Sequence, residues 1–191
     1  MAHKFIVGMT ASGKTTLAKM IASQMFSRGN QCLVLDPLLD EWPDGCEVTE
    51  KSDEFLKLCK SKKRCILFVD EGASSVGRYN NEMQWLATQS RHWGHVCVFI
   101  SQGVTQIAPI IRQQCDTFIV FACGQSNRKL IAEETDNDLV IDTKLKKGEF
   151  WHISRFEPIK RGKIHFPENG EKAEVSKLTV TYNIEKVRRD D

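Results

Sequence analysis

Short apolar segments alternate with longer amphipathic segments along most of this 191-residue chain. The apolar segments are rich in β-branched or aromatic residues and do not alternate regularly with polar ones. Strands that are buried on both faces of a parallel sheet have this pattern. The sequence therefore predicts strands over residues 4–7, 31–35, 64–69, 96–100 and 117–122.

The segments between these strands have the spacing of helices. Apolar residues recur there at intervals of three and four, which predicts amphipathic helices over residues 14–27, 50–60, 80–93 and 127–134. An alternation of strands and helices is typical of an α/β fold, in which helices flank a mostly parallel sheet.

The pattern changes after Gly148. Residues 150–153, 163–166 and 177–184 alternate between apolar and polar, and turn-forming residues separate them, which predicts antiparallel strands. We therefore expect a single domain in which a core over residues 1–148 carries a small β-rich C-terminal extension over residues 149–191. A chain of this length can bury one substantial hydrophobic core.

Composition narrows the class of protein. Hydrophobic residues make up 41% of the chain and charged residues 27%, which is ordinary for a globular protein and excludes a disordered or collagen-like one. No apolar run approaches the roughly 18 residues of a membrane span, and we expect no signal peptide. The seven cysteines include no C-x-x-C pair, so we expect a reducing compartment and neither disulfide bonds nor a zinc site.

Charge is distributed unevenly, although the net charge is only +2. Residues 143–191 hold 12 Lys and Arg against 8 Asp and Glu, whereas the rest of the chain is slightly acidic. This basic quarter is either an ordinary solvated surface or a face for nucleic acid. The candidate contacts, each of which can equally be solvated surface, are residues 72–81, the lysines Lys144, Lys146 and Lys147, and the basic group Lys160, Arg161 and Lys163.

One motif carries specific chemistry. Residues 8–15 read G-M-T-A-S-G-K-T, which matches the phosphate-binding pattern G-x-x-x-x-G-K-[ST], and they lie between a predicted strand and a predicted helix. Backbone N–H groups of such a loop and the positive end of the helix bind phosphates. The expected nucleotide-binding residues are Gly8, Thr10, Ala11, Ser12, Gly13, Lys14, Thr15 and Thr16. Lys14 would neutralise phosphate charge, and the Thr15 hydroxyl would face Mg²⁺.

Polar residues end two further predicted strands. Asp70 and Glu71 follow the third strand, and Gln102 follows the fourth. Parallel strands end at one edge of a sheet, so we expect these side chains to face the phosphate loop. Asp70 would hold Mg²⁺, Glu71 would polarise the attacking water, and Gln102 would sense the γ-phosphate. An Asp-Glu pair at this position favours hydrolysis over phosphate transfer to another acceptor.

Two arginines are candidates for completing the site. Phosphoryl transfer requires positive charge in its transition state, and an arginine finger supplies it in many enzymes. Arg91 closes the helix after the acidic strand, and Arg112 precedes the fifth strand. Either could reach the nucleotide of a neighbouring subunit, and either could instead be a favourable cation at the end of a helix.

The order of these motifs resembles a known family. Residues 8–16 read G-M-T-A-S-G-K-T-T and residues 65–71 read C-I-L-F-V-D-E. Residues 90–102 read S-R-H-W-G-H-V-C-V-F-I-S-Q, and I-A-P-I-I-R-Q-Q-C-D follows at 107–116. This series is similar to the FtsK–HerA group of DNA-translocating P-loop ATPases. It is most similar to the genome-packaging ATPases of membrane-containing icosahedral viruses.

The resemblance implies a RecA-like core of the ASCE class that hydrolyses ATP with Mg²⁺. It implies a homohexameric ring that pumps double-stranded DNA, independently of its sequence, into a preformed capsid. In that family the arginine eleven residues before the sensor glutamine acts in trans, and Arg91 has this spacing to Gln102. Capsid-vertex or viral membrane proteins would be partners, in the host cytoplasm or at the packaging vertex. The chain has Ala11 near a position where many relatives carry an additional glycine.

Two other functions stay open at this point. A small nucleoside kinase of the thymidine-kinase type also has a phosphate loop and an acidic strand end, but usually carries cysteine pairs for zinc, which this chain lacks. An assembly or secretion ATPase of the same group would share the motifs, although such proteins usually have a membrane span. A nucleotide-binding scaffold without hydrolysis is disfavoured by Glu71.

Overall fold

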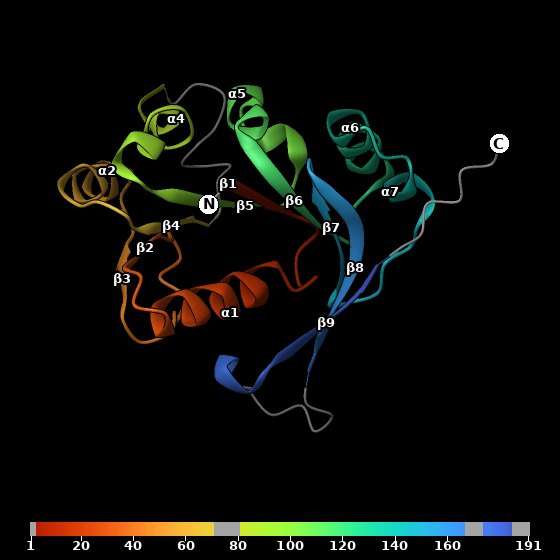
Figure 1. The fold of residues 1–191 in the computed structure, drawn as a ribbon, viewed down its shortest axis with the longest axis horizontal. Coiled ribbons are helices and arrows are strands. Elements are labelled where there is room, and N and C mark those ends of the chain that lie inside the picture. The colour runs from red at the N-terminus through yellow and green to blue at the C-terminus, as the bar shows by residue number, and fades with distance from the viewer. Residues whose placement is uncertain (1–2, 71–80, 167–173, 185–191) are drawn as a thin grey trace.

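A computed structural model of the chain describes residues 3–70, 81–166 and 174–184. In this part of the chain, one sheet of nine strands forms the centre of the fold (Figure 1). Its order is β3-β2-β4-β5-β1-β6-β7-β8-β9. The strands are β1 (His3–Val7), β2 (Cys32–Leu35), β3 (Cys46–Thr49), β4 (Ile66–Val69), β5 (Val96–Ser101), β6 (Cys115–Phe121), β7 (Glu149–Ser154), β8 (Glu157–His165) and β9 (Thr179–Ile184).

The direction of the strands divides the sheet into two parts. The pairs from β3 to β6 are all parallel, and β7, β8 and β9 are added in antiparallel fashion. This confirms the predicted α/β class with a mostly parallel sheet and a C-terminal β-addition. The edge where the parallel strands begin is called the amino edge below, and the edge where they end is called the carboxyl edge.

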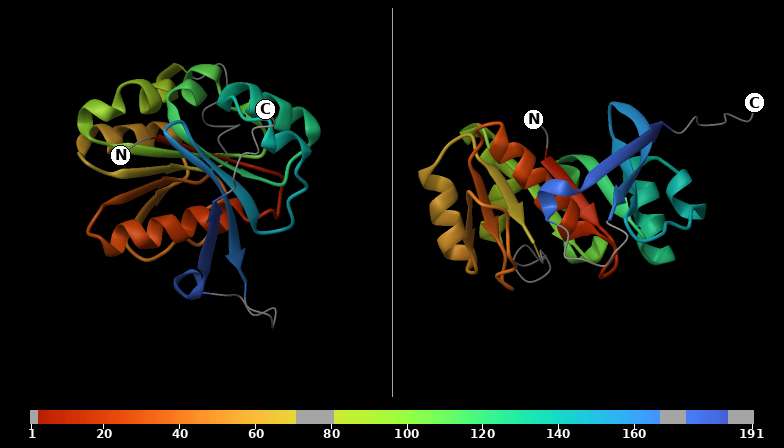
Figure 2. Two further views of the ribbon diagram at one scale, coloured as in Figure 1. Left: turned by 45° about the vertical axis from the view of Figure 1, so that its right-hand side comes forward. Right: turned by 90° about the horizontal axis from the view of Figure 1, so that it is seen from below.

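Helices cover both faces of the sheet. Helix α1 lies on one face, and the other α-helices lie on the opposite face (Figure 1). The pair β8–β9 extends past α1, away from the rest of the sheet (Figure 2). None of the described helices is both long and apolar enough to cross a membrane. The helices are α1 (Lys14–Ser27), α2 (Ser52–Ser61), α4 (Asn81–Thr88), α5 (Pro109–Gln113), α6 (Gln125–Thr135) and α7 (Leu139–Asp142), with short 3₁₀ helices η1 (Ser90–Trp93), η2 (Val104–Gln106) and η3 (Val175–Lys177).

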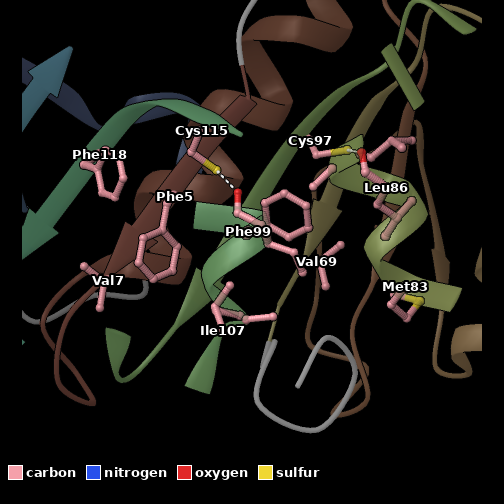
Figure 3. Close-up of a cluster of buried hydrophobic side chains, with 14 of the residues drawn as sticks. Phe5, Val7, Val69, Met83, Leu86, Cys97, Phe99, Ile107, Cys115 and Phe118 are labelled. Carbon is pink, nitrogen blue, oxygen red and sulfur yellow. Dashed lines mark hydrogen bonds between the residues drawn. The ribbon is translucent and has the colours of Figure 1, made fainter. Parts of the chain in front are cut away.

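Apolar side chains fill the space on each face of the sheet. On the face opposite α1, the rings of Phe5 and Phe118 meet edge to face at 5.9 Å between centroids. Figure 3 shows them in one cluster with Phe99 of β5 and with Met83 and Leu86 of α4. A second cluster packs α1 against the other face. Because the central strands are buried on both faces, they lack a polar alternation, as the sequence predicted.

Several short elements were not predicted from the sequence, among them β3, α5 and α7. Strand β3 reads C-E-V-T and lies at the exposed edge of the sheet, where apolar burial does not mark a strand. Helix α5 has only five residues and begins at Pro109, which suits the first turn of a helix.

One predicted helix is divided in the structure. The helix expected over residues 80–93 is described from Asn81, ends at Thr88, and continues as the 3₁₀ helix η1. The Ser90 hydroxyl donates a hydrogen bond to the Leu86 carbonyl, and Gly94 ends the turn with φ of 78°. Ser90 thus binds a carbonyl of the last α-helical turn, which tightens the chain into the η1 turn.

Two buried histidines extend the backbone hydrogen bonding near the amino edge. His3 Nδ1 accepts from the Cys97 N–H at 3.0 Å, and His95 Nδ1 accepts from the Cys65 N–H at 3.1 Å. Nδ1 can accept this hydrogen bond only when the imidazole ring is neutral. Protonation of the ring therefore breaks the bond. Burial, reinforced by the nearby Arg91 charge, lowers the pKa of His3 to about 4. Burial also lowers the pKa of His95.

We predict that the free energy of unfolding decreases as the pH falls from 6.5 toward 4. In this window unfolded His3 binds a proton that folded His3 does not bind, which costs about 1.4 kcal/mol per pH unit. Denaturant unfolding at several pH values measures the slope. His3→Gln should flatten it, whereas His92→Gln, which changes an exposed side chain, should leave it as steep as in the native chain. Equal slopes for both variants would contradict the assignment.

Candidate nucleotide-binding site

The phosphate loop lies at the carboxyl edge, between β1 and α1. Strand β1 is central, with β5 on one side and β6 on the other. The Gly8 N–H donates to the Ser101 carbonyl at 3.3 Å, and the Met9 N–H donates to the Ala122 carbonyl at 2.8 Å. These two bonds attach the start of the loop to the ends of both neighbouring strands.

The backbone of the loop explains its small residues. A Cβ on Gly8 would lie 2.6 Å from the Phe121 Cβ and 3.0 Å from the Ser12 Oγ. Gly13 caps α1 with φ of 116°, a left-handed conformation that favours glycine. Ala11 also has a positive φ, of 60°. The chain therefore holds an alanine in a conformation that suits glycine better.

Two polar side chains of the loop are largely buried. The ammonium of Lys14 donates to the Met9 carbonyl at 2.9 Å, so it lies across the loop. Ser12 is 4% exposed, and its buried hydroxyl has no hydrogen-bond partner among the described residues. A buried polar atom without a partner costs free energy, and phosphate oxygens would satisfy it. The loop therefore fits a polyphosphate.

Residues from distant segments of the chain meet beside the loop. The Thr15 hydroxyl donates to Asp70 Oδ2 at 3.1 Å, and Asp70 is 6% exposed at the end of β4. The Thr10 hydroxyl lies 3.4 Å from Gln102 Oε1, at the end of β5. Asp70 and Gln102 were expected to face the loop, and the structure places them beside its residues Thr15 and Thr10. Thr16 is the third residue of α1 and is half-buried.

The oxygen atoms of Thr15 and Asp70 suit a magnesium ion. Mg²⁺ binds oxygen ligands and is usually held by one or two carboxylates together with phosphates and water. The described residues contain no group of three or more His, Cys, Asp or Glu side chains that could hold a metal by themselves. The residues present therefore fit an ion that is shared with a bound nucleotide. Glu71, the expected catalytic base, lies outside the described residues.

Arg91 lies near the amino edge, away from the phosphate loop of its own chain. It belongs to η1, which precedes β5, and its Nη2 donates to the Gln114 carbonyl and lies 3.4 Å from Asp116 Oδ2. The side chain is still 41% exposed. Arg91 therefore lies at the opposite edge of the sheet from the phosphate loop of its own chain.

Arg155 binds the same short segment as Arg91, a placement that the sequence did not predict. Its N–H donates to the Asp116 carbonyl at 3.0 Å, and its Nε donates to the Cys115 carbonyl at 3.2 Å. Both arginines therefore contact the first residues of β6. Nothing in the sequence marks this pair, because the antiparallel return of β7 brings position 155 to the amino edge.

Arg112 has contacts of a different kind. Its Nε lies 2.9 Å from Glu134 Oε2, and its Nη1 donates to the Val104 and Ile107 carbonyls at 2.9 and 2.7 Å. The side chain is 12% exposed. These bonds connect α5, α6 and the η2 segment within one chain. Its predicted role as a finger stays a prediction, and its described donors are directed inward.

Comparison with known proteins identifies the fold. No protein-family model and no curated protein matches the chain in sequence. Among solved structures, the genome packaging NTPase B204 of Sulfolobus turreted icosahedral virus 2, in complex with sulfate, matches with a TM-score of 0.72 and 19% identity, over 84% of this chain and 94% of that one. This chain has the fold of a P-loop ATPase.

Two further matches extend this result. B204 of Sulfolobus turreted icosahedral virus, described as a DNA-packaging ATPase, has a TM-score of 0.69 and 19% identity, over 84% of this chain and 96% of that one. VirB4 of Thermoanaerobacter pseudethanolicus has a TM-score of 0.62 and 10% identity, over 83% and 87% of the two chains. The matches confirm the resemblance that the motifs indicated. Because the sequence identities are only 10–19%, these matches establish similarity of fold alone.

We predict that Gly8→Ala destabilises the protein and weakens nucleotide binding. The new methyl group would clash with the Phe121 Cβ, and overpacking of this kind costs about 1–3 kcal/mol. Gly124→Ala is the matched control, because no atom lies within 4 Å of its added Cβ and its φ is −63°. Denaturant unfolding and ATP titration measure both effects. A Gly8→Ala protein as stable as Gly124→Ala would contradict the tight packing of the loop.

Proposed function

We propose that this chain is an ATP-hydrolysing motor that moves double-stranded DNA and packages a viral genome into a preformed capsid. The observation that carries the proposal is the contact of Thr15 with Asp70 beside the phosphate loop, with Gln102 at the same edge. This arrangement joins phosphate binding, a place for Mg²⁺ and a sensor in one site. The likeness to B204, whose solved complexes include AMPPCP and ATP-gammaS, supports ATP as the substrate.

The described residues have roles that follow from their positions, and Glu71 has the role that its place in the sequence predicts. Backbone N–H groups of the loop bind the phosphates, and Lys14 exchanges the Met9 carbonyl for phosphate oxygens. Thr15 and Asp70 hold Mg²⁺, which neutralises charge on the phosphates when it is bound. Glu71 orients and polarises the attacking water. Gln102 contacts the γ-phosphate, and its link to Thr10 connects that contact with the loop.

The motor works as a ring of copies, most simply a hexamer. Arg91 reaches the nucleotide of the next subunit, because its own site lies at the opposite edge of the sheet. Supplying the arginine in trans makes hydrolysis depend on the contact between subunits. DNA is held through its phosphates, since packaging must be independent of sequence. Capsid-vertex or viral membrane proteins complete the assembly, in the host cytoplasm or at the packaging vertex.

A second candidate function is an ATPase of conjugation or secretion. The likeness to VirB4 and to the pCW3 conjugation coupling protein TcpA, with a TM-score of 0.64 and 18% identity, favours it. This chain covers 58% of that TcpA chain, whereas it covers 96% of B204. Stimulation of ATP hydrolysis by double-stranded DNA separates a DNA motor from a protein-secretion ATPase, because protein secretion has no need of DNA.

We predict that Lys14→Ala and Glu71→Gln each abolish DNA-stimulated ATP hydrolysis. Lys14→Ala removes the phosphate cation and weakens ATP binding, whereas Glu71→Gln removes the base and keeps binding. Phosphate release with and without double-stranded DNA measures activity, and ATP titration measures binding. Lys129→Ala, an exposed lysine of α6, is the control and should behave as the native chain does. Unchanged hydrolysis in both site variants would refute the proposal.

We predict that Arg91→Ala binds ATP normally but does not hydrolyse it. Because Arg91 acts on a neighbour, a mixture of Arg91→Ala and Lys14→Ala subunits should recover part of the activity that each lacks alone. In a mixed ring, some interfaces combine an intact loop with an intact arginine. Phosphate release from the mixture is the measurement.

Light scattering with an ATP analogue and DNA tests the ring itself. A chain that stays monomeric under all conditions would contradict the model, as would a mixture that stays inactive although mixed rings form.

Arg112→Ala provides a contrast to Arg91→Ala, because it should affect the stability of a single chain. Its partner Glu134 would lose an ion pair inside the chain, so stability should decrease in the isolated subunit.

A further inference from the structure

If the proposed site is correct, the order of the strands fixes the direction in which the bound nucleotide lies across the sheet. The residues for Mg²⁺ and the γ-phosphate follow β4 and β5, which lie on one side of β1 in the sheet. Strands β6, β7 and β8 lie on the other side of β1. With its γ-phosphate held near Asp70 and Gln102, the nucleotide extends from the loop toward β6–β8. Its base therefore lies on that side.

The C-terminal extension contacts the phosphate loop on this side. The Gly148 N–H donates to the Ser12 carbonyl at 2.9 Å, and the Ile164 N–H donates to the Gly148 carbonyl at 2.9 Å. A Cβ on Gly13 would lie 3.3 Å from Ile164 Cδ1 and 3.6 Å from Gly148 Cα. The start of β7 and the end of β8 thus lie directly against the start of α1.

An exposed aromatic ring lies next to this contact between β8 and the phosphate loop. Phe166 directly follows β8 and is 39% exposed. It packs on Gly148, because a Cβ there would lie 2.7 Å from the Phe166 Cε2. The ammonium of Lys147 lies 5.7 Å from the ring centroid. An aromatic ring and a cation therefore lie together next to the phosphate loop.

We propose that Phe166 stacks on the purine ring of the bound ATP and that Lys147 turns from the phenyl ring toward the α-phosphate. Stacking on an aromatic side chain is a general way to bind a base, because every base has a flat π face. Gly148 makes the platform possible, since a side chain there would displace the phenyl ring. The site would then tolerate GTP as well as ATP, because stacking does not distinguish the edges of the bases.

The test compares ATP with inorganic tripolyphosphate, which has the phosphates but no base. With Mg²⁺ present, Phe166→Ala should bind ATP about tenfold more weakly and tripolyphosphate as tightly as the native chain does. Phe166→Trp should restore ATP affinity, and its added fluorescence should be quenched by ATP but not by tripolyphosphate. Phe156→Ala is the matched control, because Phe156 is 86% exposed in the turn between β7 and β8, at the opposite edge of the sheet. It should bind both ligands normally.

The outcomes separate this proposal from the proposed function. Equal loss of affinity for both ligands in Phe166→Ala would mean that Phe166 supports the loop, and would overturn the stacking role. Unchanged ATP affinity would also overturn it, as would a native chain that binds ATP no more tightly than tripolyphosphate. A native chain that binds neither ligand would refute the nucleotide site itself.

Discussion

The parallel register of the central strands is the constraint on which the rest of the structure depends. Val7 pairs with Ser101 and Val69 pairs with Phe99, so the loops after β1, β4 and β5 leave the sheet at one edge. This register places Asp70 within 3.1 Å of the Thr15 hydroxyl, although 55 residues separate them. If the pairing of a strand shifted by one residue, each of its side chains would move to the other face of the sheet. Such a shift would separate Asp70 from Thr15.

The elements that define this register could be predicted because burial determines their residues. Phe5, Phe68 and Phe99 lie in strands that are covered on both faces, and such strands are recognisable as short apolar segments. Strand β3 and helix α5 escaped prediction for the converse reason. Residues 46–49 lie at an exposed edge, and α5 is too short to show a helical period. Their structure depends on contacts with neighbours that are distant in sequence.

The residues of the candidate site also fall into two groups. Some are predicted by a local sequence motif, and others depend on contacts between distant segments of the chain. The phosphate loop is recognisable as a local motif. The close contacts that require its glycines are less local, because Gly8 and Gly13 both lie against Phe121 of β6. Asp70 and Gln102 could be placed because parallel strands end together. The arginines could not be placed, since the ion pair of Arg112 with Glu134 and the binding of Arg155 to the same segment as Arg91 depend on tertiary packing. Sequence spacing gives a candidate arginine, whereas its contacts show which way it faces.

The C-terminal extension belongs to the site as much as the core does. Gly148, the last residue before the extension, donates to the carbonyl of Ser12 and accepts from the Ile164 N–H of β8, so two hydrogen bonds connect β8 with the backbone of the phosphate loop. Part of its basic charge also serves the sheet, because Arg161 lies 2.9 Å from Glu149 Oε2. The Lys146 N–H and, after it, Arg161 lower the pKa of that carboxyl. The excess of positive charge in this quarter is therefore not all available for contacts with another molecule. The extension therefore connects its exposed lysines with the backbone of the phosphate loop, and the proposed motor would use this connection to couple ATP hydrolysis to movement of DNA.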